Sequence, residues 1–111
     1  MQVFECNFKV YVLKNIPKED IQESLSKIID KSFYEDKDTE DFHDENKMKG
    51  YCFNSLYPLE RDGIYKEGNI YNFQIRCIHE KLKEHFIKFL TNEYTSVFKV
   101  LTSSYKVIPK R

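Results

Sequence analysis

Residues 2–13 alternate between apolar and polar side chains with a period of two. The apolar positions are Phe4, Cys6, Phe8, Val10 and Val12, and the positions between them are Glu5, Asn7, Lys9 and Tyr11. Because successive side chains of a strand point to opposite faces, this pattern predicts a β-strand with one buried and one solvent-exposed face. The sheet that contains this strand is therefore expected to be covered on one side only.

Three later segments also have strand character. Residues 51–57 are rich in aromatic side chains and stop at Pro58, which cannot donate a hydrogen bond to a neighbouring strand. Residues 70–77 alternate in the same way as the first segment, and residues 97–108 are predicted as a last strand that ends before Pro109. We expect four strands in all.

Two segments have helical periodicity. The first is predicted over 17–34, with Pro17 in the first turn, where its fixed φ angle and missing N–H are tolerated. Its apolar residues recur at helical spacing: Ile21, Leu25, Ile28 and Ile29. The second is predicted over 79–93 and is amphipathic. Its apolar side is formed by Leu82, Phe86, Phe89 and Leu90, and its charged side by Glu80, Lys81, Lys83 and Glu84.

The order strand, helix, strand, strand, helix, strand predicts an α+β protein with the ferredoxin-like βαββαβ fold. In this fold a four-stranded antiparallel sheet places its first strand beside its third, and two helices cover one face. A chain of 111 residues suits one domain, so we assign residues 1–111 to a single ferredoxin-like domain. Because the fold serves many unrelated functions, it does not by itself indicate one.

The composition excludes several classes of protein. No segment approaches the roughly 20 apolar residues that span a bilayer, and the N-terminal alternation is unlike a signal peptide. Cys6, Cys52 and Cys77 are an odd number without a close pair, which argues against a disulfide framework and a zinc ribbon. The 18 basic and 18 acidic residues balance, so this is not a strongly basic nucleic-acid binder. We expect a cytoplasmic protein without membrane contact.

The connection over 35–50 is acidic and lacks a long apolar period, so it is predicted as a loop with a short helical turn around Phe42. It contains His43, which is followed by Lys47 and Lys49. A histidine on a surface loop is ordinarily solvated and without function. Here, however, nearby carboxylates favour the imidazolium form, and a neighbouring ammonium can stabilise a phosphoryl transition state. These residues are therefore also candidates for acid–base and phosphoryl chemistry.

No metal ion or cofactor is predicted. His79 and His85 are six residues apart on the second helix and cannot share a ligand, so we interpret both as helix-surface residues. Cys6 and Cys77 fall on the buried faces of neighbouring strands, where free cysteines act as small apolar residues. The acidic run lacks the ligand spacing of a calcium loop, and the three glycines form no phosphate-binding loop.

A further pattern concerns RNA binding. Lys49-Gly50-Tyr51-Cys52-Phe53 resembles the start of an RNA-recognition-motif signature, and Val10-Tyr11-Val12 resembles its partner on the first strand. The signature belongs on the third strand of a βαββαβ unit, whereas these residues open the second. An RNA-binding module that uses Lys9, Tyr11 and Arg76 on the open sheet face is therefore an alternative. A ferredoxin-like assembly domain without chemistry is another.

A more specific pattern extends over nearly the whole chain. It consists of Phe42-His43-Asp44-Glu45-Asn46, Tyr51-Cys52-Phe53-Asn54-Ser55-Leu56-Tyr57-Pro58, Ile64-Tyr65-Lys66-Glu67-Gly68, Tyr71-Asn72-Phe73-Gln74-Ile75-Arg76 and Val107-Ile108-Pro109-Lys110. Together these residues resemble the N-terminal half of the CRISPR-associated repeat-RNA-processing endoribonucleases. That family has two tandem ferredoxin-like domains, so the resemblance implies a C-terminal ferredoxin-like domain as partner, which supplies most of the RNA-binding surface.

The resemblance implies metal-independent cleavage of CRISPR precursor RNA within each repeat, with no cofactor. A ribose 2′-hydroxyl attacks the adjacent phosphorus and leaves a 2′,3′-cyclic phosphate and a 5′-hydroxyl. The family's catalytic histidine follows the first helix, so the general acid or base role carries over to His43. The lysine that stabilises the phosphorane corresponds to Lys49, with Lys47 second, and Tyr34 is the candidate for an assisting tyrosine. The implied partners are CRISPR repeat RNA and a CRISPR effector complex.

Overall fold

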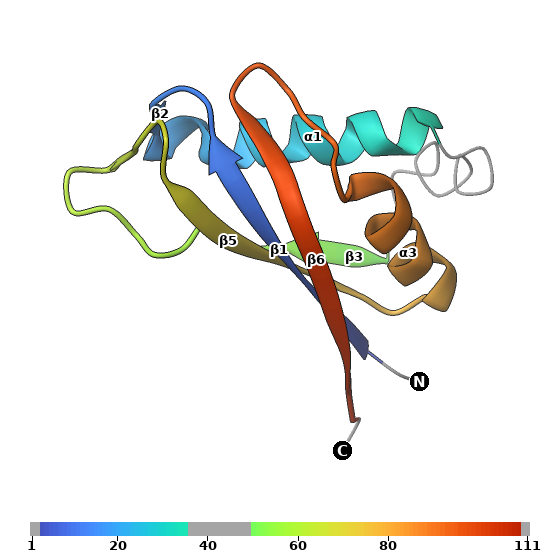
Figure 1. Ribbon diagram of the computed structural model, residues 1–111. Coiled ribbons are helices and arrows are strands. Elements are labelled where there is room, and N and C mark those ends of the chain that lie inside the picture. Colours follow the sequence, from blue (N-terminus) through green and yellow to red (C-terminus); the bar gives the residue numbers. More distant parts are fainter. Residues whose placement is uncertain (1–2, 36–49, 110–111) are drawn as a thin grey trace.

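The computed structural model describes residues 3–35 and 50–109. They form a mixed α+β structure with a four-stranded antiparallel sheet and two helices (Figure 1). The elements are β1 (Val3–Val12), β2 (Ile16–Pro17), the 3₁₀ turn η1 (Lys18–Asp20), α1 (Ile21–Glu35), β3 (Tyr51–Phe53), β4 (Ile64–Tyr65), β5 (Ile70–Cys77), α3 (Glu80–His85), the π-helical turn η4 (Phe86–Leu90) and β6 (Phe98–Ile108).

The four strands of the main sheet lie in the order β3-β5-β1-β6, and each neighbouring pair is antiparallel. The pairing of β1 with β5 places Phe4 opposite Cys77 and Tyr11 opposite Ile70. The register between β1 and β6 shifts next to Val10. The prediction that the first long strand lies beside the strand over 70–77 is therefore confirmed.

The strand predicted over 51–57 is shorter than expected. Its regular pairing ends at β3, and a single bridge between Tyr57 and Asn72 follows farther along β5. Between these two points the Oδ1 atom of Asn54 accepts the backbone N–H of Gln74 at 2.7 Å. The backbone N–H of Asn54 still donates to the carbonyl of Gln74 at 3.2 Å, so the side chain replaces only the backbone acceptor. The aromatic content of the segment did not indicate this.

The first helix begins later than predicted. Pro17 has an extended backbone with ψ 146° and pairs with Ile64 in a separate two-stranded sheet, β2-β4. The backbone N–H of Lys18 donates to the carbonyl of Gly63 at 2.7 Å, which fixes the chain before the helix starts. The placement of Pro17 in the first helical turn is therefore wrong, because this proline belongs to a strand that the sequence pattern did not reveal.

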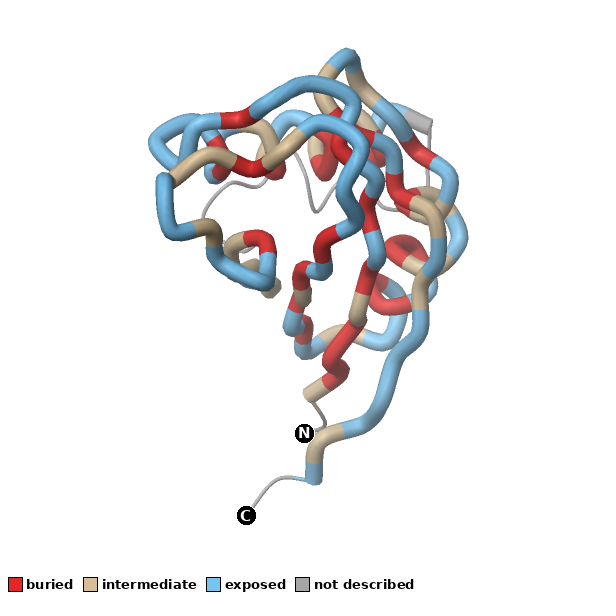
Figure 2. The backbone as a smooth tube through the Cα atoms, turned by 60° about the vertical axis from the view of Figure 1, so that its left-hand side comes forward, coloured by how far each residue is buried: buried red, intermediate tan, exposed pale blue. Residues whose placement is uncertain are grey.

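One face of the main sheet is packed against the helices, which lie next to one another on that side (Figure 1). The core consists mainly of the apolar residues of β1, β5 and α1, and at its centre the rings of Phe8 and Phe73 stack with centroids 5.0 Å apart. Figure 2 shows that buried and exposed residues alternate along the strands, as the period-two pattern predicts. The same view shows an exposed run in the last part of β6, beyond the helices.

The second helical segment consists of α3 and η4 and ends at Leu90, earlier than predicted. Lys83, expected on the charged side, is buried, and its Nζ lies 4.3 Å from the centroid of the Tyr105 ring. It lies three residues before Phe86 and therefore shares the core-facing side of the helix. Within the described residues, neither helix has the length and apolar character to cross a bilayer.

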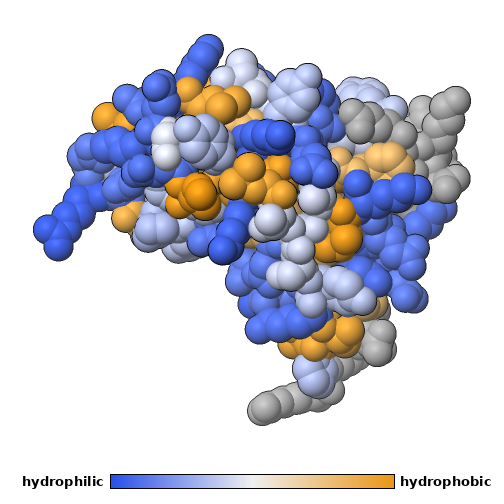
Figure 3. All heavy atoms as spheres, in the orientation of Figure 1, coloured by the Kyte–Doolittle hydropathy of each residue, from blue (hydrophilic) through white to orange (hydrophobic). Residues whose placement is uncertain are grey.

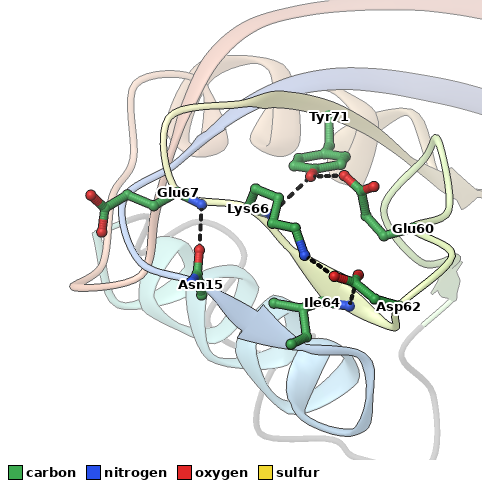
Figure 4. A network of polar contacts seen from close by, with 7 residues as sticks. All are labelled: Asn15, Glu60, Asp62, Ile64, Lys66, Glu67 and Tyr71. Carbon is green, nitrogen blue, oxygen red and sulfur yellow. Dashed lines mark hydrogen bonds and ion pairs between the residues drawn. The ribbon is translucent and has the colours of Figure 1, made fainter.

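A polar network fixes the loop that leads into β5 (Figure 4). The hydroxyl of Tyr71 donates to a carboxylate oxygen of Glu60 and accepts the backbone N–H of Lys66 at 2.9 Å. Burial, followed by the hydrogen bond to Glu60, raises the pKa of Tyr71. Lys66 also forms an ion pair with Asp62, and Asn15 accepts the backbone N–H of Glu67 at 2.8 Å. The loop is thereby held against the segment between β1 and β2.

Candidate functional site

Three of the sequence-predicted site residues, His43, Lys47 and Lys49, lie outside the described residues. The fourth, Tyr34, is the second-last residue of α1, and 77% of it is exposed. The next residue, Glu35, ends the helix. Tyr34 is therefore accessible at the end of α1, where the chain leads into the acidic segment.

The chain enters β3 through Gly50, which has a left-handed φ angle of 68°. A Cβ atom at this position would lie 2.7 Å from Cδ2 of His79, too close for any ordinary contact. The backbone N–H of Ile78 donates to the carbonyl of Gly50 at 3.1 Å. Both the backbone conformation and the close approach require glycine here, so the start of β3 is fixed against the residue that precedes α3.

His85 is not the helix-surface residue that we predicted: it is 2% exposed. Its ring stacks on that of Phe33 at 4.3 Å between centroids, and its Nε2 lies 3.0 Å from Oγ of Ser32. Because Ser32 donates its own proton to the carbonyl of Ile29 at 2.6 Å, its oxygen accepts from His85. The serine is thus not activated as a nucleophile, and the pair supports the core. The signal was present in the sequence, since His85 follows Leu82 at helical spacing.

Tyr51, the first residue of β3, is half-buried. Burial, and then the negative charge of Asp30, raise the pKa of Tyr51 to about 12. The phenol therefore stays protonated at neutral pH, where it can donate a hydrogen bond but cannot act as a base.

Cys6 and Cys77 lie on the buried faces of β1 and β5, as predicted. The neighbouring Cys6 thiol and burial raise the pKa of Cys77. A protonated, buried thiol is unreactive. Among the described residues, no three histidine, cysteine, aspartate or glutamate side chains are grouped in a way that could hold a metal ion.

The other face of the main sheet, here called the open face, carries the residues that alternate with the core. These are Glu5, Asn7, Lys9 and Tyr11 of β1, Cys52 of β3, Ile70, Asn72, Gln74 and Arg76 of β5, and Lys99, Thr102, Ser104 and Lys106 of β6. This set contains four cations and one carboxylate, although the whole chain has no net charge. In the view of Figure 3 the surface is mostly hydrophilic, with small separate apolar groups. The fold therefore concentrates positive charge that the composition conceals.

Glu5 organises the middle of the open face. It is only 5% exposed, and its two carboxylate oxygens each contact one cation: Nη2 of Arg76 and Nζ of Lys106, both at 3.2 Å. Burial alone raises the pKa of the Glu5 carboxyl, but the hydrogen bonds and charges of Lys106 and Arg76 outweigh it, and the pKa lies below its ordinary value. Glu5 thus stays ionised and holds both cations in place.

Two hollows have Arg76 in their lining. The smaller, of about 260 Å³, is lined by Cys52, Phe53, Asn54, Gln74 and Arg76. The larger, of about 470 Å³, is lined by Val3, Gly50, Tyr51, Cys52, Arg76, Cys77 and Ile78. Arg76 and Cys52 line both hollows, of which the smaller has two amide side chains and the larger is mainly apolar.

Sequence reasoning identified Lys9, Tyr11 and Arg76 as members of the open face but missed the Glu5 contacts and the two hollows. The alternation of side chains along β1 and β5 places Glu5 and Arg76 on this face. Only the register between β1, β5 and β6 brings the Glu5 carboxylate next to the cations. No family model, no curated protein and no solved structure matches this chain.

Proposed function

We propose that this chain is the N-terminal, ferredoxin-like domain of a CRISPR repeat-RNA-processing endoribonuclease. The structural observation that carries the proposal is the open face, where four cations accompany one carboxylate on a chain with no net charge. Protein affinity for RNA depends largely on neutralising phosphates, and single-stranded RNA is read by side chains that reach its base edges. The open face offers both kinds of group, and the sequence resemblance supplies the kind of RNA.

The arrangement of the elements also supports a ferredoxin-like domain. The strand order β3-β5-β1-β6, with α1 between β1 and β3 and with α3 between β5 and β6, is the order expected for βαββαβ. The short strands β2 and β4 are then additions within the connections.

The proposed reaction needs no external reactant. The ribose 2′-oxygen forms a bond to the adjacent phosphorus, and the bond from phosphorus to the 5′-oxygen of the next nucleotide breaks. His43 either takes the proton of the 2′-hydroxyl or gives one to the departing 5′-oxygen. Lys49, with Lys47 second, stabilises the negative phosphorane as a point charge. The products are a 2′,3′-cyclic phosphate and a 5′-hydroxyl.

A second candidate is an RNA-binding module without cleavage activity. The observation in its favour is Tyr11, which is 38% exposed on the open face and lies opposite Lys99. An exposed aromatic ring beside cations can stack a base while the cations contact phosphates. The assembly domain without chemistry predicts no RNA binding.

Cleavage of repeat RNA tests the proposal, with the C-terminal ferredoxin-like domain supplied. We expect His43→Ala to slow cleavage by about 10²- to 10⁴-fold with little change in RNA binding, and wild-type activity to survive a metal chelator. Lys49→Ala is compared with Lys27→Ala, which removes an exposed lysine of α1. RNA with a 2′-deoxy nucleotide at the scissile position removes the nucleophile and serves as the chemical control.

Full activity of His43→Ala, or loss of activity with the chelator, contradicts the proposal. The 111-residue chain by itself is expected to bind a repeat hairpin in the micromolar range or more weakly and to cleave it negligibly, because positioning contributes about 7–11 kcal/mol to catalysis. RNA binding without cleavage under all conditions favours the RNA-binding module. Absence of RNA binding favours the assembly domain.

A further inference from the structure

The smaller hollow contains amide groups for which the described residues provide no hydrogen-bond partner. The side-chain amide of Gln74 has no hydrogen-bond partner among the described residues. Asn54 uses its Oδ1 to accept the backbone N–H of Gln74, and its amide NH₂ is left to donate. An amide that can both donate and accept, next to a second donor, matches the edge of a nucleobase.

The guanidinium of Arg76 has N–H donors that the described residues leave unused. The side chain is 56% exposed, and within the described residues only one of its five N–H donors is committed, to Glu5 at 3.2 Å. Because the Glu5 carboxylate is nearly buried, it fixes the guanidinium from the protein side and leaves the other side to solvent. A guanidinium held in this way is suited to a phosphate, which it can contact through two parallel hydrogen bonds.

The sizes of the two hollows limit what they can hold. Pockets for whole drug-sized ligands measure about 300–1,000 Å³. The smaller hollow, about 260 Å³, is below that range and the larger, about 470 Å³, is near its lower end, so each suits one planar ring system. The larger is lined mainly by apolar residues, among them Val3 and Ile78, which favour van der Waals contact with a ring over recognition of its edge.

We propose that the hollows beside Arg76 bind two successive nucleotides of single-stranded RNA. One base enters the smaller hollow and is recognised at its edge by Gln74 and Asn54, the connecting phosphate lies on Arg76, and the neighbouring base occupies the larger hollow. This assignment rests on the proposed function only in taking RNA as the ligand. Glu5 is a positioning residue for Arg76.

NMR titration of the ¹⁵N-labelled 111-residue chain with the hexamers rU₆ and rA₆ tests this site. The largest shift changes are expected at Cys52, Asn54, Gln74 and Arg76. Gln74→Ala should weaken binding by about two- to tenfold, the effect of one lost hydrogen bond. Asn72→Ala, which removes an exposed amide from the same strand and face outside the hollows, is the matched control and should leave binding unchanged.

Arg76→Gln provides a second measurement, made as a salt series. Loss of one phosphate contact should reduce the logarithmic salt slope by about 0.7. Gln74→Ala changes no charge and should leave the slope unaltered, so the two variants separate base recognition from phosphate binding. Circular dichroism of each variant establishes that it is folded.

The proposal is overturned if neither hexamer binds, if the shift changes are confined to the Tyr11 end of the open face, or if Asn72→Ala weakens binding as much as Gln74→Ala. These results are independent of cleavage. Activity that depends on His43 without hexamer binding refutes this site and leaves the proposed function standing. Hexamer binding without cleavage of repeat RNA refutes the proposed function and leaves this site standing.

Discussion

The two faces of the main sheet use polar residues in opposite ways. On the helix-covered face the buried polar side chains Ser32 and His85 bond to one another within an aromatic environment. On the open face most polar side chains reach solvent, and the side-chain amide of Gln74 has no hydrogen-bond partner among the described residues. The covered face thus supplies the packing of the fold, and the open face is the surface that we propose binds RNA.

Glu5 is the exception to this division. It belongs to the open face by its position in β1, yet it is almost completely buried and contacts two cations. A buried charge is tolerated only where partners compensate for its lost hydration. The open face therefore has one point at which binding residues and stability are linked.

Neighbouring residues of β5 provide the largest contrast between the faces. Phe73 is buried and stacks on Phe8, whereas Asn72 is exposed on the open face. We expect Phe73→Ala to lower the free energy of unfolding by about 3–5 kcal/mol, because it leaves a cavity in the core. Asn72→Ala should change it by no more than about 0.5 kcal/mol. Urea denaturation measures both, and similar losses would mean that the open face is part of a second packed layer.

Two glycines give a smaller contrast. Gly50 and Gly68 both have left-handed φ angles, 68° and 87°. A Cβ atom on Gly68 would find only the Tyr11 hydroxyl, at 3.9 Å, whereas on Gly50 it would meet His79 at 2.7 Å. In both alanine variants we expect the left-handed backbone conformation to lower the free energy of unfolding by about 1–2 kcal/mol. In Gly50→Ala the close contact with His79 should lower it by about 1–2 kcal/mol more.

Thermal or urea unfolding of both glycine variants measures this difference. When His79→Ala is added to Gly50→Ala, the stability lost through the close contact should be regained. The stability lost through the backbone conformation should not. Equal losses for the two single variants would show that His79 moves aside without cost.

The sequence predicted the long strands well because period two is a direct consequence of one-sided burial. The strand over 70–77 matches β5 residue for residue, and the pairing of β1 with β5 was expected. The short strands β2 and β4 were missed because a strand of two residues is too short to show an alternating pattern. In addition, the position of Pro17 fitted the start of a helix equally well. The side chain of Asn54 that ends the regular pairing of β3 had no signal in the pattern.

The candidate site was less predictable than the fold. The alternation of side chains assigned Glu5 and Arg76 to the open face, but contact between them depends on the register between β1 and β5. The two hollows depend on how side chains of β3 and β5 fill space, which periodicity does not determine. The prediction for His85 was wrong for another reason. It gave more weight to the polar character of histidine than to the helical spacing from Leu82, which places His85 in the core.

Glu5 provides the smallest and most specific test, since it asks whether its charge stabilises the fold. Its pKa in the folded protein lies below the ordinary value of 4.5 because Lys106 and Arg76 outweigh the effect of burial. A carboxyl with a lowered folded pKa contributes stability that is complete above the unfolded pKa and is lost as pH falls through the folded one. We expect Glu5→Gln to lower the free energy of unfolding by about 1 kcal/mol at pH 7.

The difference between wild type and Glu5→Gln should therefore shrink as the pH falls below about 4.5. Glu23→Gln is the matched control, because Glu23 pairs with Lys27 in an exposed ion pair of α1 that should contribute about 0.5 kcal/mol or less at any pH. Urea unfolding of the three proteins at several pH values between 3 and 7 gives the result. If the Glu5→Gln difference stays constant over this range, the loss comes from packing and not from charge. Glu5 would then fill space between β5 and β6 without holding Arg76 by its charge, and the open face would be separate from the stability of the fold at every position.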